Sequence, residues 1–325
     1  IPQTTQQETE AVAAFFEADY RFSDQWVLTV GGRYTEDEKT SRQFGSVSTI
    51  PGQDPVEKWH EFTPKVGLRY NMTDDVMFYA TYSKGYRAGG FNGRVASLEE
   101  AIQPYDPETI DNYEFGVKTE LLDNRLRLNA TIFNMDYKDK QEELQLASNE
   151  TDTGQKTVVI NPSSATIRGV ELEMQAYLNE NLSVRANLGY LDSEYDDFVY
   201  TDVEGSVTDL SGLEFRRAPD FTGTLDATYE WDMAGGNAWV RASYRHIGAH
   251  FTNATNNAEL ANDSQGLVDA SVNYAINNLQ FSLFGRNLGD ENGYTHGYEV
   301  AGLWSYASTR PPRTYGLEVV YNFNN

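Results

Sequence analysis

Apolar and polar residues alternate strictly over much of residues 163–198, and this is the clearest pattern in the chain. Val170 and Leu172 fall on one face of an extended segment, whereas Glu171 falls on the other. An asparagine-rich turn at residues 179–181 interrupts the alternation, which then resumes. A period of two residues predicts β-strands, and two such runs joined by a short turn predict a β-hairpin.

Each apolar run of this hairpin covers roughly nine residues, about the length that a tilted strand needs to cross a bilayer. The opposite face carries Glu171, Glu173 and Arg185, which is too much charge for the packed core of a soluble protein. One apolar face and one charged face fit the wall of a membrane barrel, with lipid outside and a wet lumen inside. This single hairpin is equally compatible with a soluble β-sandwich. The choice between a membrane barrel and a soluble protein therefore depends on the rest of the chain.

The same alternation recurs along the chain and predicts about thirteen antiparallel strands, with short turns alternating with long loops as in bacterial outer-membrane barrels. The predicted long loops include residues 35–57, a stretch of about twenty residues that ends near residue 163, and residues 198–214. No helical period of any length is visible. We therefore expect one all-β domain, residues 1–325, that forms part of an antiparallel transmembrane β-barrel.

Aromatic residues gather near the predicted short-turn ends of the strands, where an interfacial aromatic girdle belongs. They are Tyr20, Phe22, Trp26, Tyr70, Tyr229, Trp231 and Phe323. This position predicts that the short turns lie at one membrane surface, on the periplasmic side, and the long loops at the other.

Composition narrows the function classes. The chain has 0 Cys and 4 His, so it has no thiolate nucleophile and too few histidines for a histidine-rich metal centre. Its net charge of -24 disfavours nucleic-acid binding, because no surplus of basic residues can neutralise phosphates. No apolar run is long enough for a transmembrane helix, which leaves a barrel possible because barrel strands are only half apolar.

No enzyme motif stands out. The paired carboxylates at residues 99–100 and 196–197 lie in predicted loops, where solvated charge explains them best. The glycine-rich residues 85–93 do not join a strand to a helix with phosphate-loop spacing. His246 and His250 are four residues apart, and an ordinary polar loop position is favoured over metal binding. We expect no catalytic residues, no metal and no cofactor.

Five phrases occur in an order that matches the strand pattern, and together they resemble the C-terminal barrel of TonB-dependent outer-membrane receptors. The phrases are YATYSKGYRAGGFN (79–92), PETIDNYEFGVK (107–118), SATIRGVELE (164–173), FGRNLGDENGY (284–294) and RTYGLEVVYNF (313–323). The resemblance covers nearly the whole chain. It implies a barrel of roughly 22 strands in the outer membrane, with a lumen plugged by an N-terminal domain.

In that family, an inner-membrane energising complex acts through TonB on an N-terminal box, and substrate binds on the outer side. The chain shows neither plug nor box, and its odd strand count places one terminus on the outer side, whereas single-chain barrels have an even count. We expect it to be the N-terminally truncated, C-terminal portion of a longer barrel. Final residues beyond Phe323 also depart from the family pattern.

Lumen-facing charges are expected to contact the plug or each other. Glu114 could pair with Lys118 on one face of one strand, and Arg168 with Glu171 on adjacent elements. Gly169 and Gly285 are expected to relieve crowding in a curved wall. Residues close to the long loops are the candidates for substrate contact, because aromatic rings and arginines suit a flat iron chelate or a sugar. The candidates are Tyr86, Arg87, Phe91, Arg94, Tyr105, His246, His250 and Trp304.

Binding of lipopolysaccharide or of neighbouring carboxylates is an alternative role for Arg87 and Arg94. The resemblance implies TonB-dependent uptake of a bulky, scarce nutrient, with an iron–siderophore complex as the expected cargo. Cobalamin, haem or an oligosaccharide, and a passive porin-like or structural barrel, remain alternatives. The expected partners are TonB and its energising complex, the extracellular ligand, and outer-membrane lipid and lipopolysaccharide.

Overall fold

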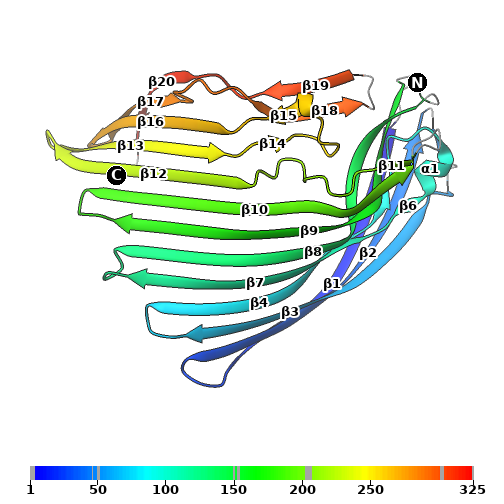
Figure 1. Ribbon diagram of the computed structural model, residues 1–325, viewed down its shortest axis with the longest axis horizontal. Helices are drawn as coiled ribbons and strands as arrows, with labels where there is room; N and C mark the ends of the chain where they lie inside the picture. The colour runs from blue at the N-terminus through cyan, green and yellow to red at the C-terminus, as the bar shows by residue number, and fades with distance from the viewer. Residues whose placement is uncertain are drawn as a thin grey trace.

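The computed structural model describes residues 4–45, 47–49, 52–148, 151, 154–201, 207–300 and 304–323. Within these residues, thirteen antiparallel strands follow one another in a single curved wall (Figure 1). They are β1 (Thr4–Arg21), β2 (Trp26–Phe44), β3 (Val56–Asn71), β4 (Val76–Arg87), β7 (Glu108–Leu121), β8 (Leu126–Ala147), β9 (Gln155–Tyr177), β10 (Leu182–Thr201), β12 (Phe221–Met233), β13 (Gly236–Ile247), β16 (Gln265–Ile276), β17 (Leu279–Arg286) and β20 (Thr314–Tyr321).

The remaining elements lie in the long connections. They are β5 (Gly90–Phe91), α1 (Leu98–Ile102), β6 (Pro104–Tyr105), β11 (Val207–Asp209), β14 (His250–Phe251), the 3-10 turn η1 (Ala258–Leu260), β15 (Ala261–Asn262), β18 (Tyr294–Val300) and β19 (Trp304–Thr309). The predicted thirteen-strand antiparallel wall is thus confirmed, whereas the short helix α1 was not expected. Among the described residues, no helix is both long and apolar enough to cross a membrane.

Short turns and long connections lie at opposite ends of the wall, which we call the turn end and the loop end. The turn between β16 and β17 has Asn277 at a φ of 48°, and that between β12 and β13 has Gly235 at a φ of 78°. Such left-handed positions favour Gly and Asn, which explains the composition of these turns. Figure 1 shows the long connections gathered on the right, beyond the strands.

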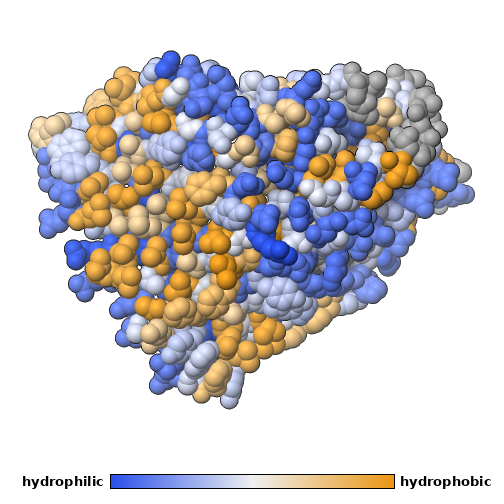
Figure 2. Space-filling view, viewed as in Figure 1, coloured by the Kyte–Doolittle hydropathy of each residue, from blue (hydrophilic) through white to orange (hydrophobic). Residues whose placement is uncertain are grey.

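The register aligns apolar side chains across neighbouring strands on one face of the wall. Ile132 pairs with Val170, Val170 with Tyr190, and Tyr190 with Phe221. These side chains are between 39% and 54% exposed, so they form no packed interior. Figure 2 shows apolar residues gathered towards the turn end and hydrophilic residues towards the loop end. Such an apolar band, rimmed by polar residues, is what a barrel presents to lipid.

An aromatic girdle lies at the turn end, as predicted. Phe22 stacks on Tyr20 and on Trp26 with ring centroids 6.3 and 6.2 Å apart, and Trp26 stacks on Tyr70 at 4.5 Å. The same end carries a Tyr229–Trp231 contact at 5.7 Å. Amphipathic rings in this position anchor a barrel at the membrane interface.

On the opposite, inner face, aromatic rings cover glycines of the neighbouring strand. A Cβ atom at Gly169 would lie 2.4 Å from Cζ of Phe133, and one at Gly316 would lie 2.3 Å from Cζ of Phe284. Gly169 therefore permits the Phe133 ring to approach the backbone of the neighbouring strand closely, as expected. Gly285 lies on the outer face, where a Cβ would meet Leu288 at 2.6 Å. Aromatic cover of a strand glycine restores the side-chain packing that the glycine lacks.

The predicted long loops are the main error of the strand prediction. β2 continues to Phe44 and β3 begins at Val56, and β8 and β9 together reduce the loop before residue 163 to residues 148–154. β10 likewise continues to Thr201, so residues 198–214 are not simply a loop. Above the membrane both strand faces meet water or other loops, so the strands extend without the alternation by which they were predicted.

Neither predicted ion pair forms. Oε1 of Glu114 accepts a 2.5 Å hydrogen bond from the hydroxyl of Tyr79, and Nζ of Lys118 lies 5.4 Å from the Tyr79 ring centroid. Tyr79 therefore occupies the space between the two charges. Arg168 and Glu171 lie on opposite faces of the same strand, β9, and Nε of Arg168 donates to Asn134 at 2.9 Å. An odd spacing along one strand rules out a direct pair.

Candidate ligand-binding site

The connection between β4 and β7, residues 88–107, ties together strands that are far apart in the wall. Nε2 of Gln43 in β2 donates to the carbonyl of Asn92 at 3.2 Å. The Asn92 side chain donates to the carbonyl of Val159 in β9 at 3.0 Å and accepts from the amide of Val159 at 2.7 Å. This connection, which we call the crossing segment, therefore holds the loop ends of β2 and β9 in a fixed relationship.

The crossing segment is anchored at its short helix. The hydroxyl of Ser97 caps α1 by accepting from the amide of Glu100 at 3.3 Å. Glu100 also forms an ion pair with Lys156 of β9, whose side chain is only 5% exposed. Because a buried lysine requires a partner, this pair fixes the helix against the wall.

A compact group of residues lies where β2 and β3 meet the crossing segment. We call it the Trp59 cluster, and its members are Lys39, Trp59, Tyr86, Arg87, Gly89, Phe91 and Tyr105. Trp59 is 8% exposed, and its ring centroid lies 6.4 Å from that of Phe91. Nζ of Lys39 donates to the carbonyl of Gly89 at 2.5 Å and lies 5.8 Å from the Trp59 ring centroid. A Cβ at Gly89 would lie 2.2 Å from the carbonyl oxygen of Tyr105, so only glycine allows this approach.

The electrostatics of the cluster reflect its partial burial above the membrane-spanning part of the strands. Burial lowers the pKa of Lys39, opposed by the negative charge of Asp37. Burial also raises the pKa of the Tyr105 hydroxyl. Arg87 is the accessible cation here, because its side chain is 66% exposed and its Nη1 lies 3.5 Å from Glu108, a long contact for an ion pair.

The structure brings four predicted site residues, Tyr86, Arg87, Phe91 and Tyr105, into this region. The hydroxyl of Tyr86 is buried and has no hydrogen-bond partner among the described residues. Phe91 is 6% exposed and serves to pack the cluster. Arg94 belongs to the same crossing segment, where its side chain is exposed and its carbonyl accepts from the amide of Thr157 at 3.0 Å.

The other three candidates lie elsewhere. His246 shares a strand face with Tyr244, and its ring centroid lies 5.6 Å from that of Phe221, which places it on the outer face of the wall. Nδ1 of His250 donates to the carbonyl of Gly248 at 2.9 Å. Trp304 is 51% exposed in β19. Within the described residues, no group of three or more His, Asp and Glu side chains is arranged to hold a metal ion.

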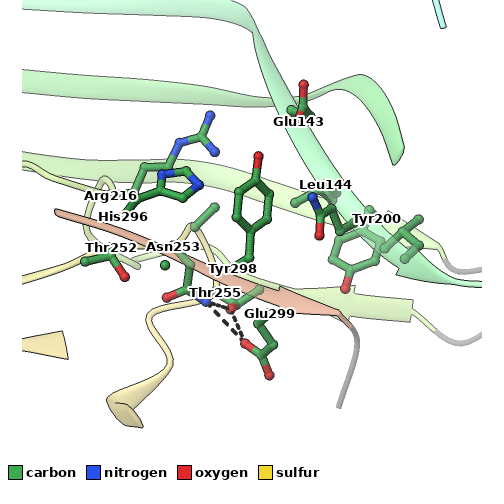
Figure 3. Close-up of a pocket in the computed structure, with 14 residues that line it drawn as sticks. Glu143, Leu144, Tyr200, Arg216, Thr252, Asn253, Thr255, His296, Tyr298 and Glu299 are labelled. Carbon is green, nitrogen blue, oxygen red and sulfur yellow. Dashed lines mark hydrogen bonds between the residues drawn. The ribbon is translucent and has the colours of Figure 1, made fainter. Parts of the chain in front are cut away.

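A second site, absent from the sequence prediction, is a pocket of about 270 Å³ at the loop end (Figure 3). We call it the Tyr298 pocket. It is built from residues 143–146 of β8, Tyr200 of β10, Arg216, residues 252–255 after β14, and residues 296–299 of β18. Residues 294–300 fell in a predicted loop, although the Tyr–His–Tyr alternation in YTHGYEV could have indicated a strand.

Hydrogen bonds hold the polar groups of this pocket in place. Oε2 of Glu299 accepts from Oγ1 of Thr255 at 2.9 Å and from Nδ2 of Asn253 at 3.2 Å (Figure 3). The guanidinium of Arg217 donates to Nδ1 of His296.

Behind the pocket lies a buried charge. Glu142 is 2% exposed, and its Oε2 lies 3.3 Å from Nη2 of Arg216. Lys140 forms an ion pair with Glu142, and its Nζ lies 4.8 Å from the ring centroid of Phe215 and 5.7 Å from that of Tyr195. Two cations thus neutralise the carboxylate, and aromatic faces shield one of them. Arg216 is positioned by this network at the pocket wall.

Comparison with known proteins places the chain in a family. A family model described as "TonB dependent receptor-like, beta-barrel" matches residues 2–288. The pesticin receptor of Yersinia pestis is 24% identical over 318 residues, which cover 97% of this chain and 44% of the relative. The chain spans less than half the length of the curated relatives that it matches.

Solved structures share the fold. The ferric yersiniabactin uptake receptor FyuA from Yersinia pestis has a TM-score of 0.81 at 21% identity, covering 99% of this chain and 47% of that one. The siderophore receptor PiuA from Acinetobacter baumannii has a TM-score of 0.76 at 22% identity, covering 97% and 43%. With its thirteen-strand wall, lipid-facing band and aromatic girdle, the chain therefore belongs to the TonB-dependent receptor-like β-barrel family of the bacterial outer membrane.

Proposed function

We propose that the intact protein takes up a bulky, scarce nutrient across the outer membrane in a TonB-dependent way, and that the nutrient is a ferric siderophore. One observation carries this proposal: a barrel wall of this receptor family bears two clusters of aromatic and charged residues at its loop end, the Trp59 cluster and the Tyr298 pocket. The relatives named above include receptors for siderophores, which supports an iron chelate over cobalamin, haem or an oligosaccharide.

The thirteen strands form part of a larger closed barrel in this proposal. β1 and β20 each pair with one neighbour only within the described residues. Exposed strand edges in lipid leave backbone groups unsatisfied at a cost of several kcal/mol each, so further strands are expected to pair with both edges. TonB and its energising complex would act through other parts of the intact protein. The family consists of transport receptors, and we propose no enzymatic activity.

Uptake of an ⁵⁵Fe-labelled siderophore by cells that carry the intact protein as their sole receptor tests this function. We expect saturable uptake that disappears when TonB is deleted. Uptake that rises linearly with concentration and persists without TonB would instead indicate a passive pore.

Arg87 is the residue of the Trp59 cluster that we propose to contact the ligand, because its guanidinium is exposed and its contact with Glu108 is long. Arg87→Ala should raise the concentration for half-maximal uptake. Arg127→Ala is the matched control, because this exposed arginine pairs with Glu120 at the turn end, 2.6 Å away. An unchanged half-maximal concentration for Arg87→Ala would remove Arg87 from the site.

A further inference from the structure

Positive charge is in surplus at one end of the Tyr298 pocket. Lys140 and Arg216 both pair with the buried Glu142, as described above. Arg217, the next residue along the chain, donates to the His296 ring and has no ion-pair partner among the described residues. Three cations are therefore matched by one carboxylate. The chain has 49 Asp and Glu against 25 Lys and Arg, so a shortage of carboxylates does not explain this surplus.

The other carboxylates of the pocket wall lie away from this end. His296 and Tyr298 are on one face of β18, whereas Glu299, at an odd spacing, is on the opposite face, where the hydrogen bonds described above hold it. Figure 3 shows the exposed Glu143 at the far edge of the view, directed away from the pocket. Neither carboxylate therefore opposes an anion that reaches Arg216.

Arg216 can bind an anion without leaving its network. Its side chain is 43% exposed, and its contact with Glu142 involves one terminal nitrogen, Nη2, at 3.3 Å. A guanidinium has five N–H groups in a planar fork, so most of them remain for a ligand. Figure 3 shows Arg216 on the same side of the Tyr298 ring as His296. The pocket thus presents oriented N–H donors next to an aromatic ring.

Aromatic rings form a flat surface beside these donors. The ring centroids of His296 and Tyr298 are 4.4 Å apart in an edge-on contact. Tyr306 lies directly opposite Tyr298 in the register of β18 and β19, so the two rings share a face of this hairpin. Trp304, two residues from Tyr306, lies on the same face, and these two side chains are 51% and 55% exposed. The aromatic face therefore continues from the pocket along the hairpin.

The remaining walls are aromatic and aliphatic. Tyr200 contributes a further ring, and Leu144 and Leu146 contribute buried methyl groups. A volume of about 270 Å³ is below the usual range for a whole drug-sized ligand and suits one arm of a larger molecule.

These features match a flat group that combines a ring with a negative charge. We infer that the Tyr298 pocket binds an anionic aromatic arm of the transported chelate, a catecholate, phenolate or aryl carboxylate. The ring of this arm packs against Tyr298, and its charged oxygen accepts from Arg216. A ferric hydroxamate is aliphatic and uncharged, so it would leave both the ring surface and the surplus charge unused. The inference rests on the proposed uptake function and narrows its cargo to aromatic chelates.

Three small probes of nearly the same size test this assignment on the intact, detergent-solubilised protein. Benzoate carries a ring and a charge, benzamide keeps the ring without the charge, and cyclohexanecarboxylate keeps the charge without an aromatic ring. In saturation-transfer NMR titrations we expect saturable millimolar binding of benzoate. Benzamide should bind about tenfold more weakly and cyclohexanecarboxylate about threefold more weakly. Equal affinity of benzoate and either analogue would overturn the assignment.

Two variants locate the binding in the pocket. Tyr298→Leu should abolish the preference for benzoate over cyclohexanecarboxylate, and Arg216→Gln should abolish the preference for benzoate over benzamide. Because Arg216→Gln also removes one partner of the buried Glu142, Arg216→Lys is the variant that retains the charge, and it should keep that preference. Arg127→Gln, at the turn end, should leave all three affinities unchanged. Unaltered preferences in Tyr298→Leu and Arg216→Gln would place the bound probe elsewhere and overturn the assignment.

Uptake measurements separate failure of the pocket from failure of the function. TonB-dependent uptake of a ferric hydroxamate, with no uptake of a ferric catecholate or phenolate, would overturn the pocket assignment alone. Benzoate binding with the predicted variant pattern, in a protein that transports no chelate, would support the pocket chemistry and contradict the uptake function.

Discussion

The hydroxyl of Tyr195 donates a 2.7 Å hydrogen bond to Oε1 of Glu142, and the two residues are 0% and 2% exposed. This bond joins β10 to β8 above the membrane-spanning part of the wall. Because the other oxygen of Glu142 faces Arg216, the Tyr195–Glu142 pair connects the core of the loop end to the wall of the Tyr298 pocket.

Loss of the Tyr195 hydroxyl should loosen the loop end. Tyr195→Phe removes one of the two donors to Oε1 of the buried Glu142 and leaves Lys140 as the other. A hydrogen bond to a charged group contributes about 1.5–3 kcal/mol. We expect faster hydrogen exchange at the backbone amides of residues 140–146, measured by mass spectrometry. Tyr190→Phe is the control on the same strand, because Tyr190 is 54% exposed on the outer face. Equal exchange in both variants would mean that the bond does not stabilise this region.

The same pair predicts a dependence on alkaline pH. Burial and then the charge of Glu142 raise the pKa of Tyr195 above its ordinary value of 10.0. Above about pH 10 an unfolded tyrosine loses its proton, whereas the folded one retains it, so the folded state binds more protons. Stability should therefore fall as pH rises from about pH 10 upwards.

Other tyrosines also titrate in this range, so the measured quantity is a difference. The free energy of unfolding of the wild type minus that of Tyr195→Phe should decrease between about pH 9 and pH 12. Chemical denaturation in detergent at stepped pH values measures it. A constant difference would show that Tyr195 ionises alike in the folded and unfolded states.

Gly169 should tolerate no side chain. In Gly169→Ala the new Cβ would lie 2.4 Å from Phe133 and 2.7 Å from the carbonyl oxygen of Tyr190, and backbone atoms cannot move aside cheaply. We expect a loss of about 1–3 kcal/mol, as in other overpacked sites. Gly67→Ala is the matched substitution, because its nearest neighbour would lie 3.5 Å away. Urea unfolding in lipid vesicles should leave Gly67→Ala near the wild type; equal losses would contradict the crowding.

Adjacent residues of β9 should respond differently to charge. Leu172 is 39% exposed on the lipid-facing side, whereas Glu171 is on the opposite face. Leu172→Arg should cost about 2–4 kcal/mol near the bilayer midplane, and Glu171→Arg, in the wet lumen, much less. Unfolding of the intact protein in bilayers, followed by tryptophan fluorescence, measures both. A larger loss for Glu171→Arg would reverse the assignment of the two faces.

The local alternation of apolar and polar residues was sufficient to predict the strands of the wall, but it was insufficient to predict the structure of the loop end. Where one strand face meets lipid and the other meets water, the two environments demand alternating residues, and the alternation predicted the strands and girdle correctly. Above the membrane no such contrast exists, so the extensions of β2, β8 and β10 carried no comparable signal. The predicted Arg168–Glu171 pair failed for a different reason, because the two residues lie on opposite faces of one strand rather than on adjacent elements.

The site residues show the same contrast between what the local sequence predicts and what it does not. Tyr86, Arg87, Phe91 and Tyr105 were found together because they belong to one short stretch of chain, and proximity in sequence kept them close in space. The Tyr298 pocket combines five segments between residues 143 and 299, and no single segment has a sequence pattern that predicts the pocket. His246 looked like a loop residue, and only the register of β12 and β13 placed it beside Phe221 on the outer face.

The amino-acid sequence by itself determined that this protein is a wall of antiparallel strands with a lipid face, because the two-residue period is a local property of each strand. Tertiary structure alone decided how the crossing segment joins β2 to β9 and how Tyr200, Arg216 and Tyr298 come to line one pocket. Those arrangements depend on side chains from distant strands meeting in space, which no local period encodes.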